Sequence, residues 1–157
     1  MAELVTNQTD LTLVRELQRD ARQTNRSLAE KTGLAPSTSL ARVRDLEQRG
    51  VLSGFHGQVD LGALGRGLQA LVFVRLRPKN DETINRFLDH MWNKPETIAL
   101  SLIAGAEDVI IHLAVADADA LQRVILNDIS SFAGVYDERT SLLFSHRRKT
   151  VIEPITE

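Results

Sequence analysis

The sequence predicts an α+β protein of two domains, an N-terminal winged helix-turn-helix domain and a C-terminal ferredoxin-like domain. In the first third of its 157 residues, apolar residues recur at the spacing of short amphipathic helices. From Leu68 onward, strand-like segments and two helical segments follow the order βαββαβ, which is the ferredoxin-like order. Glycines cluster between these two patterns. The predicted boundaries are residues 1–60 for the first domain, 61–67 for a linker, 68–150 for the second domain and 151–157 for a frayed tail.

Two short helices open the first domain. Asp10 is a suitable N-cap for the first helix, whose apolar stripe comprises Leu13, Val14 and Leu17. The second helix begins near Thr24 to Ser27 and ends at Gly33. Thr24 or Asn25 can cap it, and Ser27 with Glu30 also fits a capping box. Glycine ends a helix readily because it adopts the left-handed conformation at little cost.

The third helix is the candidate DNA-reading element. Pro36 suits its first turn, where the N–H group that proline lacks would have no helical partner. An apolar stripe follows at spacings of three, and we expect it to be buried: Leu40, Val43 and Leu46. Hydroxyls can bond phosphates, and arginine can bond guanine through two N–H groups. The expected DNA-binding residues are therefore Ser37, Thr38, Ser39, Arg42, Arg44 and Arg49.

An ordinary amphipathic helical hairpin with a solvated charged face is the alternative to a helix-turn-helix. The small Ala29 and the short connection after Gly33 favour the helix-turn-helix, because such a unit needs closely packed helices. Residues 51–55 and 56–59 then predict a brief strand pair in the position of a wing.

The second domain alternates strands with helices. Leu71 and Phe73 point away from the side that the helices would cover, and the middle strands are apolar on both sides. Because a large exposed apolar sheet face is unusual on a monomer, we expect two sheets to pack face to face in a symmetric dimer. The alternative is that loops or the first domain cover this face. The predicted strands are residues 68–76, 97–104, 109–116 and 136–146, and the predicted helices are residues 81–92 and a segment from Asp117 or Asp119 to Gly134.

The chain resembles the feast/famine (Lrp/AsnC) family of bacterial and archaeal transcription regulators over nearly its whole length. Four segments of the first domain carry the resemblance: Leu17-Gln-Arg-Asp-Ala-Arg22, Leu28-Ala-Glu-Lys-Thr-Gly-Leu34, Arg42-Val-Arg-Asp-Leu-Glu47 and Gly50-Val-Leu-Ser-Gly-Phe55. The resemblance implies a regulator of amino-acid metabolism that dimerises through its sheets, assembles into octamers and binds a small effector between dimers.

The resemblance also implies an effector site in the second domain. Its matching residues are Ala104, Gly105, Ala106 and Asp108 in a loop, and Thr140, Ser141 and Leu142 on the last strand. An amino-acid effector suits this loop, because a carboxylate such as Asp108 can accept hydrogen bonds from an ammonium group. Glycine lets a ligand carboxylate approach the backbone N–H groups around Gly105. A hairpin turn with two solvated acids is the alternative reading of this loop.

Charge and composition narrow the possible functions. The net charge is -2, and residues 1–57 hold eight Lys and Arg against seven Asp and Glu. So weakly basic a DNA-binding domain favours a dimer or larger assembly, which multiplies phosphate contacts. Cysteine is absent, so neither disulfides nor thiolate chemistry is expected. We see no signal peptide or membrane-spanning segment, and we expect a cytoplasmic protein without metal or cofactor.

Two further functions stay open. The sirohaem decarboxylases resemble the same family fold and use histidine and arginine around a tetrapyrrole. Against an enzyme, the four histidines are too dispersed for metal-ligand spacing: His56, His90, His112 and His146. An architectural protein that wraps DNA without an effector is the other alternative. The basic triplet at 147–149 is expected to be a solvated strand end.

Overall fold

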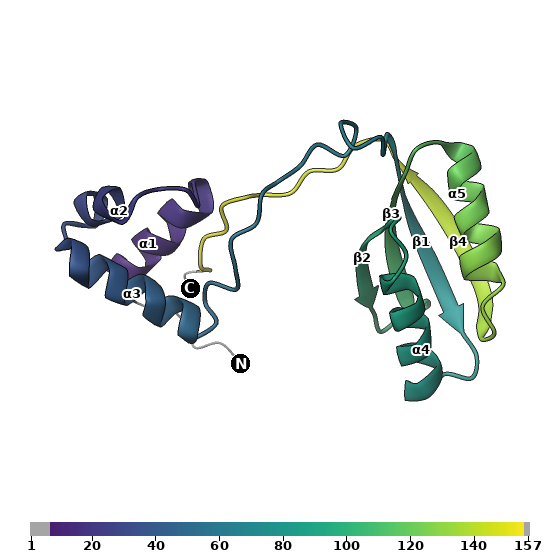
Figure 1. The fold of residues 1–157 in the computed structure, drawn as a ribbon. Coiled ribbons are helices and arrows are strands. Elements are labelled where there is room, and N and C mark those ends of the chain that lie inside the picture. The colour runs from purple at the N-terminus through teal and green to yellow at the C-terminus, as the bar shows by residue number, and fades with distance from the viewer. Residues whose placement is uncertain (1–6, 156–157) are drawn as a thin grey trace. The chain divides into compact units, whose positions relative to one another are not determined.

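The computed structural model describes residues 7–155, which fall into two compact units. The first unit comprises residues 7–57 together with 147–155, and the second comprises residues 58–146. The chain therefore passes from the first unit to the second and back again (Figure 1). This return was not expected, because the sequence predicts a frayed tail after residue 150.

The first unit is a bundle of three helices. They are α1 (Gln8–Arg19), α2 (Asn25–Thr32) and α3 (Pro36–Gln48). The structure confirms three of the predicted signals: Thr24 caps α2, Gly33 ends it with φ of 67°, and Pro36 is in the first turn of α3. Their shared core comprises Leu13, Leu17, Leu28 and Leu46, against which Val14, Val43, Val51 and Leu52 pack.

Three expectations for this unit are wrong. The N-cap of α1 is Asn7, whose side chain accepts from the N–H groups of Thr9 and Asp10, so Asp10 lies within the helix. Leu40 is 39% exposed and does not belong to the core. No strand pair forms over residues 51–59. The N–H groups at 51 and 52 instead bond the carbonyl of Leu46, and so close the end of α3.

The tail is bound to α1 of its own unit. Arg15 donates from Nε and Nη2 to the Glu153 carboxylate at 2.6 and 3.1 Å. The Gln18 side chain donates to the carbonyl of Ile152 and accepts from its N–H group, at 3.1 and 2.8 Å. The expectation of a frayed tail is therefore wrong as far as Glu153.

The second unit is a four-stranded antiparallel sheet with helices on one face, as the sequence predicts. The strand order is β2-β3-β1-β4. Asn80 caps α4 and Asp117 caps α5. The elements are β1 (Leu68–Leu76), α4 (Asp81–Trp92), β2 (Thr97–Leu102), β3 (Val109–Val115), α5 (Ala118–Val124), the π-helical segment η1 (Ile125–Ser130) and β4 (Val135–Leu143).

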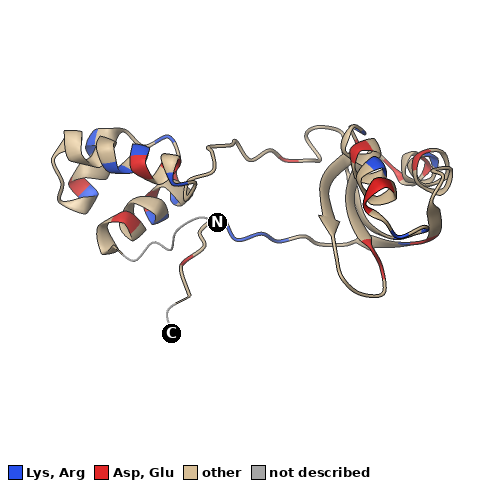
Figure 2. Cartoon of the chain, turned by 90° about the horizontal axis from the view of Figure 1, so that it is seen from below, with Lys and Arg blue, Asp and Glu red and all other residues tan. Residues whose placement is uncertain are grey.

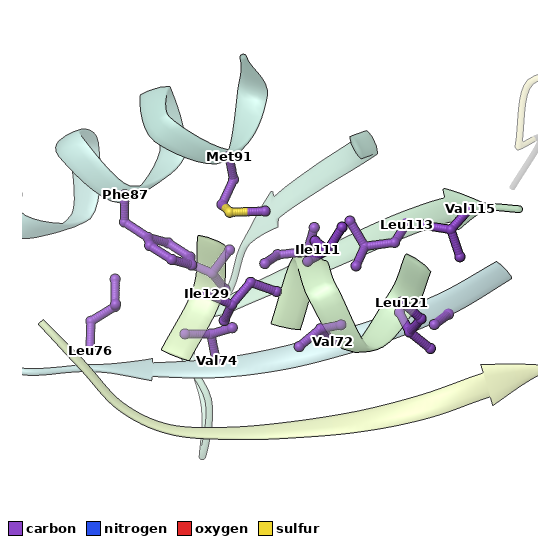
Figure 3. Close-up of a cluster of buried hydrophobic side chains, with 13 residues drawn as sticks. Val72, Val74, Leu76, Phe87, Met91, Ile111, Leu113, Val115, Leu121 and Ile129 are labelled. Carbon is purple, nitrogen blue, oxygen red and sulfur yellow. The ribbon is translucent and has the colours of Figure 1, made fainter. Parts of the chain in front are cut away.

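The core of this unit lies between the sheet and its helices. Figure 3 shows Phe87 and Met91 of α4 directed toward the side chains of β1 and β3. The alternation along β1 confirms the predicted face, since Ala70, Val72, Val74 and Leu76 are at most 1% exposed. Leu71 and Phe73 point to the opposite face and are partly buried. The helices therefore cover one face of the sheet and leave the other uncovered within this unit.

Candidate functional site

Helix α3 has a buried face and an exposed face. Ser39 and Leu46 are fully buried, and Val43 packs against the core cluster that contains Leu46. Four exposed residues lie on the opposite side: Ser37, Ala41, Arg44 and Gln48. The last three follow Ser37 by four, seven and eleven positions. That spacing aligns side chains along one helix face. These four residues therefore form the exposed face of α3, which we call the outer face.

The placement of Ser39 rules out one predicted DNA contact. Its side chain is 0% exposed, and its Oγ has no hydrogen-bond partner among the described residues. Ser39 is buried because positions 39, 43 and 46 follow the helical period of 3.6 residues and so share one face. The predicted stripe of Leu40, Val43 and Leu46 has a spacing of three and does not follow that period. The prediction that Ser39 contacts DNA is wrong, but Ser37 and Thr38 are exposed.

Two of the three predicted arginines have partners inside the unit. Nη1 of Arg42 lies 2.8 Å from Oδ1 of Asp10, whose side chain is only 9% exposed. Nη1 of Arg49 lies 3.0 Å from Asp45 and 3.9 Å from Asp10. The two contacts with Asp10 connect α1 to α3 and its C-cap residue. Among the described residues, Arg44 has no ion pair, so it is the predicted arginine that is free to meet a ligand.

Charge on the three helices is mixed. Figure 2 shows basic and acidic residues interspersed over them. Several basic residues are neutralised locally: Arg19 and Lys31 both pair with Glu16, at 2.8 and 2.5 Å, and Arg26 pairs with Glu30 at 3.2 Å. Among the described residues, the three helices therefore carry few cations without a nearby acid, which favours the use of several units together on DNA.

The loop between β2 and β3 carries a buried carboxylate. Asp108 is 6% exposed, and its Oδ2 accepts from the N–H of Leu76 at 2.9 Å. Its Oδ1 lies 2.6 Å from Nζ of Lys79. Burial raises the pKa of Asp108, but these two bonds outweigh burial and the pKa lies below its ordinary value. Asp108 is thus ionised and already contacts a cation of its own chain, with which the ammonium group of a ligand would compete; its expected role as the acceptor for that group stays a prediction.

A small hollow opens beside this carboxylate. Its volume is about 130 Å³, and its lining residues are Arg75, Leu76, Arg77, Lys79, Gly105, Ala106 and Asp108. The structure thus brings together three of the predicted effector residues. Arg75, Arg77 and Lys79 were not predicted, although their alternation at the end of a strand is a signal once β1 is placed beside the loop.

The other predicted effector residues lie elsewhere on the sheet. Thr140, Ser141 and Leu142 are exposed on β4, opposite Val72, Leu71 and Ala70 of β1. Asp108 instead lies at the other end of β1, where its N–H donates to the carbonyl of Val74 and its carboxylate accepts from the N–H of Leu76. Ala104 is exposed and does not line the hollow. Within one chain, the two predicted halves of the effector site therefore do not form one pocket.

The open face of the sheet is apolar at its centre. Phe73 is opposite Ile110, and Leu71 is opposite His112. The His112 ring nitrogen Nε2 lies 3.0 Å from Oε1 of Gln69, and its ring lies 5.1 Å from that of His146. Burial and then the charge of His146 lower the pKa of His112. A neutral, partly buried histidine suits an interface.

Known domain families match both units. Residues 6–53 match the family described as winged helix-turn-helix DNA-binding, and residues 69–151 match the Lrp/AsnC ligand binding domain. The HTH-type transcriptional regulator AldR of Mycolicibacterium smegmatis is 36% identical over 139 residues, which cover 88% of this chain and 81% of AldR. The transcriptional regulator AzlB of Bacillus subtilis is 30% identical over 154 residues, which cover 98% of each chain.

Solved structures share the arrangement within the two units. The transcriptional regulator NMB0573 of Neisseria meningitidis, in complex with L-Met, matches with a TM-score of 0.87 at 26% identity, over 96% of this chain and 97% of that chain. E. coli AsnC shares the fold with a TM-score of 0.85 at 22% identity, over 96% of this chain and 100% of that chain. The named relatives are regulators and not enzymes. None of the helices within residues 7–155 has both the length and the hydropathy that a membrane-spanning helix requires.

Proposed function

The chain belongs to the Lrp/AsnC family of DNA-binding transcriptional regulators, and on that premise we propose that it reads a specific operator through the outer face of α3 and responds to a small effector related to amino acids. The observation that carries the first half is the division of α3 into two faces. The buried face fixes the helix in its unit, and the outer face presents Arg44 between Ala41 and Gln48. Arginine and glutamine are the side chains that bond guanine and adenine edges in the major groove.

The active form would be a dimer that pairs two open sheet faces. Leu71, Phe73 and Ile110 supply an apolar centre, and the Arg139 guanidinium lies 5.0 Å over the ring of Phe73. An isologous contact of this kind gives two α3 helices related by a twofold axis. The operator would then be pseudo-palindromic, with half-sites about one helical turn apart or a multiple of it. Assembly of dimers into an octamer and a cytoplasmic location remain predictions.

Selection of binding sites from a random DNA library tests the DNA-binding proposal. The purified full-length chain should enrich a pseudo-palindromic sequence, and analytical ultracentrifugation should show at least a dimer at micromolar concentration. Absence of any enriched sequence, or a monomer at that concentration, would contradict the proposal. An absorbance scan of the same sample for bound tetrapyrrole tests the enzyme alternative.

The effector would act by linkage between two sites. A ligand that favours one assembly, or one spacing of the DNA-binding units, must change DNA affinity by the same factor by which DNA changes ligand affinity. The hollow beside Asp108 is the proposed site of contact, with Thr140, Ser141 and Leu142 contributed from another chain of the assembly. The L-Met bound by the Neisseria regulator supports amino acids and their relatives as the first ligands to test. No response to any of them would favour an architectural role.

A further inference from the structure

The hollow at the end of β1 is strongly cationic. Three of its seven lining residues are basic, Arg75, Arg77 and Lys79, and Asp108 is the single acid among them. Among the described residues, neither arginine has an ion pair with an acidic side chain, although Asp137 is the register partner of Arg75. The neighbouring loop acid Glu107 is bound to Arg139 at 2.9 Å. Positive charge therefore exceeds negative charge in the hollow.

The two arginines are held by one aromatic ring. The guanidinium carbons of Arg75 and Arg77 lie 5.5 and 5.6 Å from the centroid of Tyr136. Guanidinium groups at this distance from an aromatic face are attracted to it and lose side-chain freedom. A guanidinium that is already positioned loses less entropy when it binds an oxyanion, and its planar N–H fork matches a carboxylate.

The single acid is already neutralised by the chain itself. Nζ of Lys79 lies 2.6 Å from one oxygen of Asp108, and the N–H of Leu76 bonds the other at 2.9 Å. A ligand ammonium group would have to compete with Lys79 for Asp108, and it would lie beside the three basic residues that line the hollow. A ligand carboxylate, by contrast, meets two guanidiniums that have no ion pair with an acidic side chain among the described residues.

We propose that this hollow binds the carboxylate of a small anionic ligand that lacks an ammonium group, so that a 2-oxo acid is preferred over the amino acid with the same side chain. The inference rests on the proposed function, because it names the ligand class of the same regulator. A volume of about 130 Å³ admits the polar end of such a molecule and is well below the ~300 Å³ typical of sites for larger ligands.

Calorimetric titration of the full-length chain with matched ligand pairs tests the proposal. The pairs are pyruvate and L-alanine, 4-methyl-2-oxopentanoate and L-leucine, and 2-oxoglutarate and L-glutamate. We expect at least one 2-oxo acid to bind about ten-fold more tightly than its amino acid, the effect of one charge-assisted bond. Arg77→Gln should lose this binding.

Lys79→Met provides the sharper measurement. Removing the Lys79 ammonium frees Asp108, so affinity for the 2-oxo acid should fall while affinity for the amino acid rises. Lys149→Met is the matched control, because it makes the same change at an exposed position of the first unit. Melting curves establish that each variant is folded.

Three results would overturn the inference. They are an amino acid that binds as tightly as its 2-oxo acid, a preference that Lys79→Met leaves unchanged, and no binding of any 2-oxo acid. Operator binding by the same sample separates this failure from failure of the proposed function. If the chain binds its operator but none of the six ligands, only the ligand proposed for the hollow is wrong. If the chain selects no DNA sequence, the proposed function as a regulator is wrong.

Discussion

Replacing Arg42 by alanine should destabilise the helical unit, whereas replacing Arg44 should not. The Arg42 guanidinium is 2.8 Å from Asp10, and the Asp10 side chain is 9% exposed, so the substitution leaves a nearly buried carboxylate without its closest cation. Removing one partner of a fully buried pair costs about 3–5 kcal/mol. The Arg42 side chain is itself 37% exposed, and Arg49 remains 3.9 Å from Asp10, so we expect about 1–2 kcal/mol.

Thermal unfolding followed by circular dichroism measures this loss. For a domain of this size each kcal/mol lowers Tm by about 4–8 °C, so Arg42→Ala should lower the Tm of the helical unit by roughly 5–15 °C. Arg44→Ala should leave Tm unchanged within error and weaken operator binding by about 1–3 kcal/mol in fluorescence anisotropy. Arg123→Ala, an exposed arginine on α5, is the matched control for the loss of one positive charge.

A double-mutant cycle isolates the pair. Asp10→Ala combined with Arg42→Ala should cost less than the sum of the two single substitutions, with a coupling energy of at least about 0.5 kcal/mol. Additive losses, an unchanged Tm for Arg42→Ala, or a lower Tm for Arg44→Ala would refute the division of α3 into a structural and a DNA-facing side.

Four other outcomes follow from the structure. Ser39→Ala should raise the free energy of unfolding by about 1 kcal/mol in urea titration, because it removes a buried hydroxyl without a partner. Leu40→Ala should cost under about 1.5 kcal/mol in the same assay, since Leu40 is 39% exposed; a loss typical of a core leucine would contradict its placement. The lowered pKa of Asp108 adds stability that is complete above the ordinary value of about 3.9 and is lost as pH falls through the folded value, so Asp108→Asn should flatten the acid limb of a pH–stability curve. The lowered pKa of His112 adds stability to the sheet unit that is complete above pH about 6.5 and is lost as pH falls through the pKa of the folded state. If the His112→Gln variant loses the same stability over this pH range, another group is responsible.

Local rules were sufficient for most of the fold. The predicted strand 68–76 and helix 81–92 coincide with β1 and α4. The signals that predict them, the spacing of apolar residues and the capping residue, involve only residues close together in the sequence. The turn at Gly33 and Pro36 is equally local. Rules of this kind also misplace residues when the assumed spacing departs from the helical period, as the exposure of Leu40 and the burial of Ser39 show.

What escaped prediction depends on residues distant in sequence. Arg42 pairs with a carboxylate 32 positions away, and Lys79 reaches Asp108 on another loop. No pattern within a single segment records these contacts. For that reason a local pattern predicts one role for all the arginines of α3, and it does not reveal that Lys79 bonds the acid of the loop. The tail shows the same effect, since Glu153 bonds Arg15 across almost the whole chain.

The return of the chain to its first unit has a consequence for proteolysis. A single cut in the stretch between α3 and β1 would leave residues 147–155 on the larger fragment, where they still carry the bonds to α1. Those few exposed bonds are weak individually, because a surface ion pair contributes about 0–1 kcal/mol. In the intact chain, however, the segment between α3 and β1 keeps the tail covalently linked to the helical unit, and so keeps the tail at a high effective concentration near α1. Nicked protein should therefore separate into two pieces on dilution, while the uncut chain keeps its tail bound.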